Sequence, residues 1–473
     1  MEFKKLSVQT KVSLIFVILI IVLWAIIYPR GSDTGLYHLQ TMVWAEKFAV
    51  VPGLGNLHGR LAFNPSSLVL STLFSYHPNY FPVFYPINSL CFFIFFIWLF
   101  FTLEKYHIFI RYLLVIGLFV FIVSAYGTLI SSVSTDMLPN IIICYLLLRS
   151  IIDKHYFSKI LPIVTISVFC ITAKLSAIAI TLLALYIVIQ QVRQKNYKVI
   201  WAIIFLSIIT ILPWCIRNII QSGYLIYPFP SIDIFSFDWK IPIDSVQAEK
   251  DSIYNWGKVR MHNEMVSQMS FAEWFPIWFN NLNKYNLGIF LAALISPFII
   301  LLNLKKLKKQ PIIFFTYCIA VIGVISCFFS APDIRFGWGF FIMAGFIPLL
   351  LLNYKFLDKR FLINIPILLF FVFFILHFSS NYCQMMREQV MIGKPYLLLY
   401  KPQRYDYLKM LENPTFSTVS VGNQEIYYPS TAEQLCYDAC FPCTIEDRLE
   451  MTKGKLEMRG KTLQDGFRIR DFK

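Results

Sequence analysis

Residues 12–40 read VSLIFVILIIVLWAIIYPRGSDTGLYHLQ, an apolar run that ends at Tyr28 and gives way to a polar segment containing Asp33 and His38. An α-helix needs about 17–25 apolar residues to cross the ~30 Å hydrocarbon core of a bilayer. This stretch therefore predicts a membrane-spanning helix with an acidic residue placed just beyond its end.

The composition extends this pattern to the whole chain. Of its 473 residues, 57% are hydrophobic, 17% are aromatic and only 15% are charged, and the mean hydropathy is +0.62. Soluble globular chains carry roughly 25% charged residues. The composition excludes a soluble multidomain enzyme and a disordered protein, and it leaves the class of polytopic membrane proteins.

We expect an all-α membrane protein with about 11 transmembrane helices. The apolar runs that predict them cover residues 12–28, 83–103, 112–131, 137–148, 160–173, 175–190, 199–216, 287–304, 312–329, 340–352 and 361–379. The runs at 160–173 and 175–190 could form one kinked helix, but we favour two, because basic clusters flank them on both sides. Residues 1–380 are then the transmembrane domain.

The net charge of +15 sets the orientation of these helices. Lys and Arg concentrate in alternate connections, as at Lys305, Lys306, Lys308 and Lys309, and basic residues favour the cytoplasmic side. This bias predicts a cytoplasmic N-terminus. The first apolar run lacks a small-residue cleavage site, so we expect a signal anchor rather than a cleaved leader. Residues 29–82 and 217–286 become the large outside loops. The bases are spread over separate loops, which argues against nucleic acid as a partner.

The tail, residues 381–473, is polar enough to form a small extracytoplasmic α+β domain, and residues 416–421 alternate like a strand. It carries Cys383, Cys436, Cys440 and Cys443, whereas the other cysteines lie within apolar runs. With no histidine near the cluster, we expect disulfides in preference to a metal site, with the pairing left open.

The first outside loop carries the strongest candidates for chemistry. Asp33 could be either an active-site acid or the cap of a following helix, since residues 36–48 show the apolar spacing of an amphipathic helix in the membrane interface. His38 lies at the start of that helix. The turn-rich segment 51–65 adds Arg60 and Asn64, and it matches no phosphate-binding glycine motif.

Further charges stand at the outside ends of apolar runs: Asp136, Lys174, Arg217 and Arg335. Charges near membrane depth are costly, so they tend to be functional or paired, and Arg335 could simply pair with Asp333. Acids and bases gathered at one membrane face suit an anionic, lipid-linked substrate, because Arg and Lys bind phosphate and a carboxylate orients or activates a hydroxyl.

These positions resemble the GT-C superfamily of membrane glycosyltransferases, which includes oligosaccharyltransferases, protein O-mannosyltransferases and the aminoarabinose transferases of lipid A. The resemblance rests on Asp33 in the first outside loop and on segments across most of residues 1–352: Thr135-Asp136, 172–176 (TAKLS), 213–218 (PWCIRN), 222–228 and 332–336 (PDIRF). More narrowly, residues 51–64, 436–443, 458–461 and 465–469 resemble a bacterial family associated with surface polysaccharide loci.

The resemblance implies an inverting transfer of a sugar from a polyprenyl-phosphate-linked donor to a hydroxyl of a glycan, lipid or protein acceptor outside the cytoplasm. Asp33 would be the catalytic residue. His38, Arg60, Asn64, Asp136, Lys174, Arg217 and Arg335 would bind substrate. Many GT-C enzymes have an acidic pair in this loop, but Asp33 stands alone, so we assign no metal ligands and keep a divalent ion bridged by Asp33 and Asp136 only as a possibility.

Two other functions stay open. A surface polysaccharide polymerase would be expected to place arginine-rich sites in its outside loops, but residues 217–286 hold only Arg217 and Arg260. A non-enzymatic transporter or flippase would need polar residues along a path through the helices, whereas the candidate residues here cluster at one membrane face.

Overall fold

The computed structural model describes residues 7–25, 32–75, 85–103, 114, 118, 122, 129–152, 159–260, 264–352, 372, 416–430, 435–437, 440–445 and 454–470. The expected spans at 112–131 and 361–379 lie almost entirely outside these ranges, as does the tail up to residue 415, including Cys383. The molecule is mostly helical, with a small region of strands near its C-terminus.

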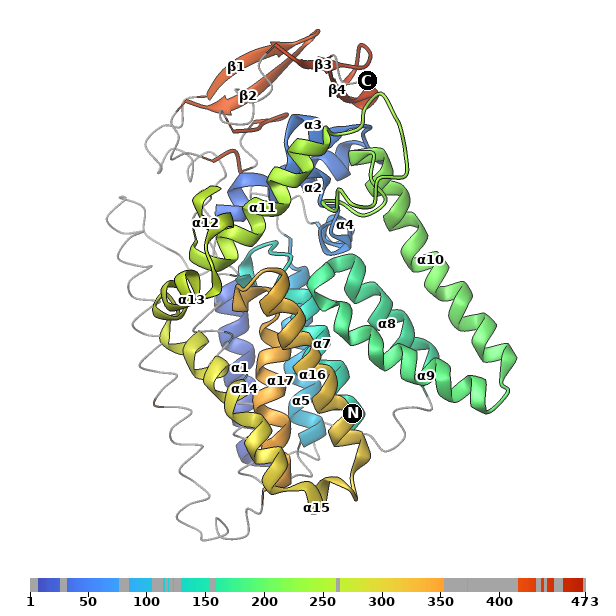
Figure 1. Ribbon diagram of the computed structural model, residues 1–473, viewed down its shortest axis with the longest axis vertical. Helices are drawn as coiled ribbons and strands as arrows, with labels where there is room; N and C mark the ends of the chain where they lie inside the picture. The colour runs from blue at the N-terminus through green and yellow to red at the C-terminus, as the bar shows by residue number, and fades with distance from the viewer. Residues whose placement is uncertain are drawn as a thin grey trace.

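Apolar helices form a bundle in the lower half of the molecule (Figure 1). Neighbouring pairs include α1 (Val8–Ala25) with α5 (Ile87–Leu103), α5 with α7 (Met137–Ile152), and α17 (Trp338–Phe346) with α7, α14 (Lys284–Leu302) and α16 (Pro311–Ser330). Their facing side chains build one large buried core that includes Phe92, Phe96, Phe340 and Phe341. Helices close all backbone hydrogen bonds internally, which hydrocarbon surroundings require.

A second group of helices forms an arm beside the bundle (Figure 1). It consists of α8 (Ile160–Ala173), the 3-10 turn η5 (Leu175–Ile180), α9 (Thr181–Arg193) and α10 (Tyr197–Ser222). Helix α8 packs on both α9 and α10. Lys174 between α8 and η5 is extended, so the runs at 160–173 and 175–190 are two separate helices, as we predicted.

Four helices of the described ranges are long and apolar enough to cross a membrane: Leu175–Arg193, Tyr197–Ser222, Lys284–Leu302 and Pro311–Ser330. The apolar helices Thr10–Val22, Ile87–Leu103, Met137–Ile152, Ile160–Ala173 and Trp338–Leu351 are shorter. Large apolar side chains of α10 face outward, with Trp201 69% and Phe205 63% exposed, as a lipid-facing helix requires. The chain is a membrane protein, but the expected count of about 11 spans is not confirmed.

The segment that we expect to lie outside, here called the first outer loop, forms short helices above the bundle (Figure 1). They are the π-helical turn η2 (Thr34–His38), α2 (Leu39–Lys47), α3 (Leu54–Leu57), the 3-10 turn η3 (Gly59–Ala62) and α4 (Ser66–Thr72). The expected helix at 36–48 is therefore present but starts as a π-turn. Leu39, Gln40, Met42 and Trp44 of α2 are buried.

The second outer segment contains α11 (Ile243–Val259), α12 (Glu264–Gln268) and α13 (Phe271–Asn280). The side chain of Ser270 and that of Glu273 cap the start of α13 reciprocally. The remaining short elements, α15 (Leu304–Leu307), η6 (Ile334–Phe336) and η7 (Ile347–Leu351), connect or extend the bundle helices.

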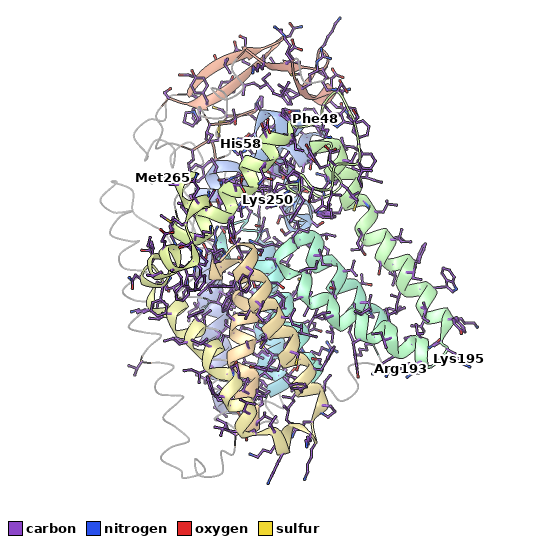
Figure 2. All side chains as sticks on the ribbon, viewed as in Figure 1. Phe48, His58, Arg193, Lys195, Lys250 and Met265 are labelled. Carbon is purple, nitrogen blue, oxygen red and sulfur yellow. A yellow bond between two sulfur atoms is a disulfide. The ribbon has the colours of Figure 1, made fainter. Side chains whose placement is uncertain are left out.

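Charged residues mark the two ends of the molecule. Arg193 and Lys195 lie at the tip of the arm, whereas His58 and Lys250 lie among the outer segments at the opposite end (Figure 2). The charge bias predicts that Arg193 and Lys195 lie on the cytoplasmic side, and this orientation stays a prediction.

Two antiparallel hairpins form the described part of the tail. Strand β1 (Phe416–Val421) pairs with β2 (Gln424–Pro429), and β3 (Leu456–Met458) pairs with β4 (Phe467–Ile469), with the 3-10 turn η9 (Leu463–Asp465) before β4. The predicted strand at 416–421 is confirmed. A disulfide joins Cys436 to Cys443. Disulfide formation in the tail is thus confirmed for one pair of the candidates.

The tail packs directly on the first outer loop. Val421, Ile426 and Phe467 share a buried core with Tyr37 and Trp44 of the loop. The Phe467 amide donates to Pro52 O at 3.0 Å, and the Tyr437 amide donates to Gly35 O at 2.8 Å. The described part of the tail therefore covers this loop.

Gln40 is the centre of this contact. Its Nε2 donates to the carbonyl oxygens of Tyr437 at 2.9 Å and Cys440 at 2.8 Å, and its Oε1 accepts from the Cys443 amide at 3.2 Å. The Gln40 residue is only 1% exposed. Its amide thus occupies the loop that the disulfide closes.

Replacing this side chain tests the contact. Gln40→Leu should lower the unfolding free energy by about 2–4 kcal/mol, because it strands buried backbone groups that cannot reach water. Thermal unfolding in detergent and the rate of proteolytic cleavage in the tail measure the effect. Gln247→Leu is the matched control, since Gln247 is exposed and its Nε2 donates to the carboxylate of Asp251 within the same helix. Equal effects of the two substitutions would contradict the assigned role.

Candidate functional site

Asp33 occupies the residue before the π-turn η2, but its side chain makes no capping hydrogen bond. Its carboxylate instead faces two arginines: Oδ2 lies 3.1 Å from an Arg335 terminal nitrogen, and Oδ1 lies 3.5 Å from one of Arg60. The side chain is 24% exposed. The sequence left open whether Asp33 caps the following helix or is an active-site acid. Its side chain does not act as a cap, and it belongs to a group of charged residues.

Arg335 joins the outer loop to the bundle. It lies in η6, directly after α16, and its Nε is 3.1 Å from Asp136 Oδ2 while another nitrogen faces Asp33. The sequence left open a simple ion pair between Arg335 and Asp333. The guanidinium of Arg335 instead contacts Asp33 and Asp136. The Asp333 carboxylate accepts the backbone N–H of Arg335 at 2.9 Å and so caps the turn that presents Arg335.

Asp136 and Lys174 form the inner end of the same group. Asp136 precedes α7 and is 3% exposed, and its Oδ1 pairs with Lys174 Nζ. The extended conformation of Lys174, between α8 and η5, directs it to this carboxylate and over the Phe336 ring, 4.1 Å from its centroid. Two helices and the turn after α16 thereby meet at one point.

Glu249 forms the outer end of the group and is the residue that sequence reasoning missed. It lies on α11, is 1% exposed, and its Oε1 is 3.0 Å from Arg60 Nε. Glu249 follows the fully buried Val246 by three residues, so helical spacing places both on the inner face of α11. The sequence signal that could have identified Glu249 was an acidic residue on the apolar face of a predicted helix.

Together these side chains form an alternating ionic chain, which we call the charge chain. Its order is Glu249, Arg60, Asp33, Arg335, Asp136 and Lys174. Acids and bases are equal in number, so the chain is neutral as a whole. Neutrality matters here because an unpaired buried charge costs several kcal/mol.

The electrostatics keep Asp33 ionised. Burial alone would raise the pKa of its carboxyl, but Arg335, His38, Arg60 and Lys174 outweigh burial and hold that pKa below its ordinary value of 3.8. Asp33 is therefore an anion at neutral pH, suited to accept a hydrogen bond or stabilise positive charge. A carboxylate with so low a pKa is a weak base.

His38 lies beside the charge chain in the last position of η2. It is 2% exposed, and within the described part of the chain neither ring nitrogen has a hydrogen-bond partner. The Tyr37 ring packs edge-on against it, with centroids 4.3 Å apart. Burial lowers the pKa of His38 to about 4, although the nearby Asp33 opposes this shift. The imidazole is neutral at physiological pH.

Asn64 and Arg217 form a separate group. Asn64 Oδ1 accepts from Arg217 Nε at 3.0 Å, and Asn64 Nδ2 donates to the carbonyl oxygen of Trp214 at 3.0 Å. Both Trp214 and Arg217 belong to α10. The two predicted residues thus tie the first outer loop to α10, and the structure does not bring them to the charge chain.

The donor set does not favour a metal at Asp33 and Asp136. Arg335 lies between the two carboxylates, and Lys174 or Arg60 engages their other oxygens. Within the described ranges, no group of three His, Cys, Asp or Glu side chains is arranged to hold an ion. We derive no step through a metal.

A protein-family model described as "Domain of unknown function (DUF8201)" matches residues 1–342. Every member of the charge chain falls within this match, whereas the described strands of the tail fall outside it. No curated protein and no solved structure matches the chain.

The pKa of Asp33 gives a prediction about stability. Because the folded-state pKa is lowered, ionised Asp33 stabilises the fold above pH 3.8, and this contribution is lost as the pH falls through the folded-state value. Wild type should therefore exceed Asp33→Asn in melting temperature at pH 7, and the difference should shrink at pH 3. Thermal unfolding in detergent across this range is the measurement. A difference that is the same at both pH values would contradict the lowered pKa.

Breaking the inner end of the charge chain gives a second prediction. Asp136→Asn leaves Lys174 and Arg335 short of a partner at a buried site and should cost about 3 kcal/mol of stability. The double variant Asp136→Asn/Lys174→Met should recover part of this loss, because it removes the unpaired ammonium.

An exposed ion pair provides the control for these Asp136 and Lys174 variants. Asp238 pairs with Arg459 and is 47% exposed, so Asp238→Asn should cost about 1 kcal/mol or less. All variants are compared by thermal unfolding. A double variant that is no more stable than Asp136→Asn alone would show that Lys174 and Asp136 are not coupled.

Proposed function

We propose that this chain, which belongs to the DUF8201 family, is a membrane glycosyltransferase. It transfers a sugar from a polyprenyl-phosphate-linked donor to a hydroxyl of a glycan, lipid or protein acceptor, with inversion at the anomeric carbon. The reaction takes place at the extracytoplasmic face of the bacterial inner membrane, and the charge chain is its site.

The observation that carries the proposal is the meeting of Asp33 and Arg335 where the apolar helices end. Asp33 comes from the outer loop after α1, and Arg335 comes from the turn after α16. Both side chains keep about a quarter of their surface exposed, 24% and 27%. An anion and a cation at the boundary of an apolar bundle suit a substrate with a hydroxyl on one side and a lipid-linked phosphate on the other.

Arg335 acts on the leaving group in this reaction. As the bond between the anomeric carbon and the phosphate oxygen breaks, negative charge builds on the polyprenyl phosphate. A guanidinium stabilises that charge through paired N–H donors. Donor phosphate must compete with Asp33 for Arg335, so donor binding frees the Asp33 carboxylate.

Asp33 acts on the acceptor. Its carboxylate accepts a hydrogen bond from the acceptor hydroxyl and holds the oxygen in line with the anomeric carbon, on the face opposite the phosphate. Arg60, held by buried Glu249, keeps Asp33 in place on its other side. The hydroxyl proton needs a stronger base than Asp33, whose pKa is lowered.

Two features support the orientation and disfavour a transporter. The disulfide between Cys436 and Cys443 fits an oxidising compartment, as an extracytoplasmic tail requires. The charge chain gathers at the outer ends of α7, α8 and α16 rather than along a path between the helices. A surface polysaccharide polymerase shares this donor chemistry and would differ in its acceptor.

The proposal is tested with protein reconstituted in proteoliposomes. The substrates are polyprenyl-phosphate sugars that carry a radiolabelled sugar, together with envelope extract as the source of acceptors. Wild type should move label from the lipid to an acceptor, and Asp33→Asn should reduce the rate about 100-fold or more while leaving expression intact. Asp251→Asn is the control, because Asp251 is an aspartate on α11 outside the charge chain. Near-normal transfer by Asp33→Asn would overturn the assignment of Asp33.

A further inference from the structure

The π-turn η2 places His38 on the same side of the chain as Asp33. The amide of Leu39 bonds to Thr34 O, which is the five-residue spacing of a π-helix. A π-helix has about 4.4 residues per turn, so residues five apart lie near one another, whereas an α-helix with about 3.6 per turn would turn them away. Without this turn, His38 and Asp33 would point in different directions.

The His38 side chain is held in place but keeps its nitrogens free. Tyr37 packs against its ring, and Arg60 lies over the Tyr37 ring with 5.8 Å between the guanidinium carbon and the ring centroid. Neither His38 nitrogen has a hydrogen-bond partner among the residues that the structure describes, at 2% exposure. An unsatisfied buried polar group costs about 1–3 kcal/mol, so this arrangement is expensive unless a ligand completes it.

The charges around His38 set its strength as a base. Burial keeps the imidazole neutral, so a nitrogen lone pair is available, but a pKa of about 4 makes it a weak base before the donor binds. Asp33 is the charge that acts most strongly on this ring, and it favours the protonated form. Arg335, Lys174 and Arg60 act in the opposite direction, and donor phosphate at Arg335 would weaken that opposition. Donor binding would thus make His38 a stronger base.

We propose that His38 is the general base of the transfer, with Asp33 stabilising the imidazolium that forms. This inference rests on the proposed function and adds the fate of the proton to it. The acceptor O–H, which Asp33 orients at first, turns its hydrogen bond from the Asp33 carboxylate to a His38 nitrogen. The acceptor oxygen then forms a bond to the anomeric carbon as this proton passes to that nitrogen. The bond between the anomeric carbon and the phosphate oxygen breaks, and its electron pair stays on the polyprenyl phosphate facing Arg335.

Chemical rescue tests this role. His38→Ala removes the base and leaves a cavity the size of an imidazole, so transfer from the radiolabelled polyprenyl-phosphate sugars should fall about 100-fold or more. Added imidazole should restore activity at least tenfold. Across a series of substituted imidazoles of similar size, the rescued rate should rise with the basicity of the added compound, which a structural role of His38 would not produce.

His58 provides the matched control. It is also buried, at 3% exposure, and lies in the same outer loop outside the charge chain. If His58→Ala lowers the transfer activity, added imidazoles should not restore it in proportion to their basicity. His38→Gln covers the case in which His38→Ala fails to fold, since it keeps a polar side chain but no base, and it should be inactive at an unchanged melting temperature.

The outcomes separate the two proposals. If wild type transfers no sugar from any of the polyprenyl-phosphate sugars tested, the proposed function is overturned, and so is the role of His38 as its base. If wild type is active and His38→Ala or His38→Gln stays within about threefold of it, only the role of His38 is overturned. Rescue that does not depend on imidazole basicity also overturns it.

Discussion

The guanidinium of Arg335, shared between Asp33 and Asp136, is the interaction on which the architecture of the outer face depends. Its two contacts, each 3.1 Å, join the first outer loop to the start of α7 through the turn after α16. A planar fork can serve two carboxylates in fixed directions, which an ammonium cannot. Since Lys174 and Arg60 engage the remaining acid oxygens, removing any one charge leaves its neighbours unbalanced in a poorly solvated site.

Much of this site could be predicted because its residues interrupt apolar patterns. Asp33, Asp136, Lys174 and Arg335 each stand at the end of an apolar run, where a charge is costly and its position along the membrane normal is fixed by the run itself. The same reasoning selected Arg217, which also stands at the end of an apolar run but bonds to Asn64 instead. The sequence therefore predicted that these residues lie at the ends of helices, but it did not predict in which direction each side chain points.

Other features had no signal that a single sequence could give. Glu249 lies in a polar helix, α11, and its burial depends on Arg60, nearly two hundred positions away in the chain. The π-turn η2 differs from an α-helix by one hydrogen-bond register, which the sequence of residues 34–38 does not reveal. The cysteine pairing depends on the fold of the loop around Gln40, so spacing alone left Cys436, Cys440 and Cys443 equivalent.

The packing of the tail on the first outer loop imposes an order on the biogenesis of the protein. Residues near position 40 emerge from the ribosome early, yet Gln40 finds its partners at Tyr437, Cys440 and Cys443, and Pro52 finds its own at Phe467. The loop that bears Asp33 therefore cannot reach its final arrangement until more than four hundred further residues have been synthesised. During that interval the first outer loop lacks the contacts that cover it, and these contacts are completed only when strand β4 has been made.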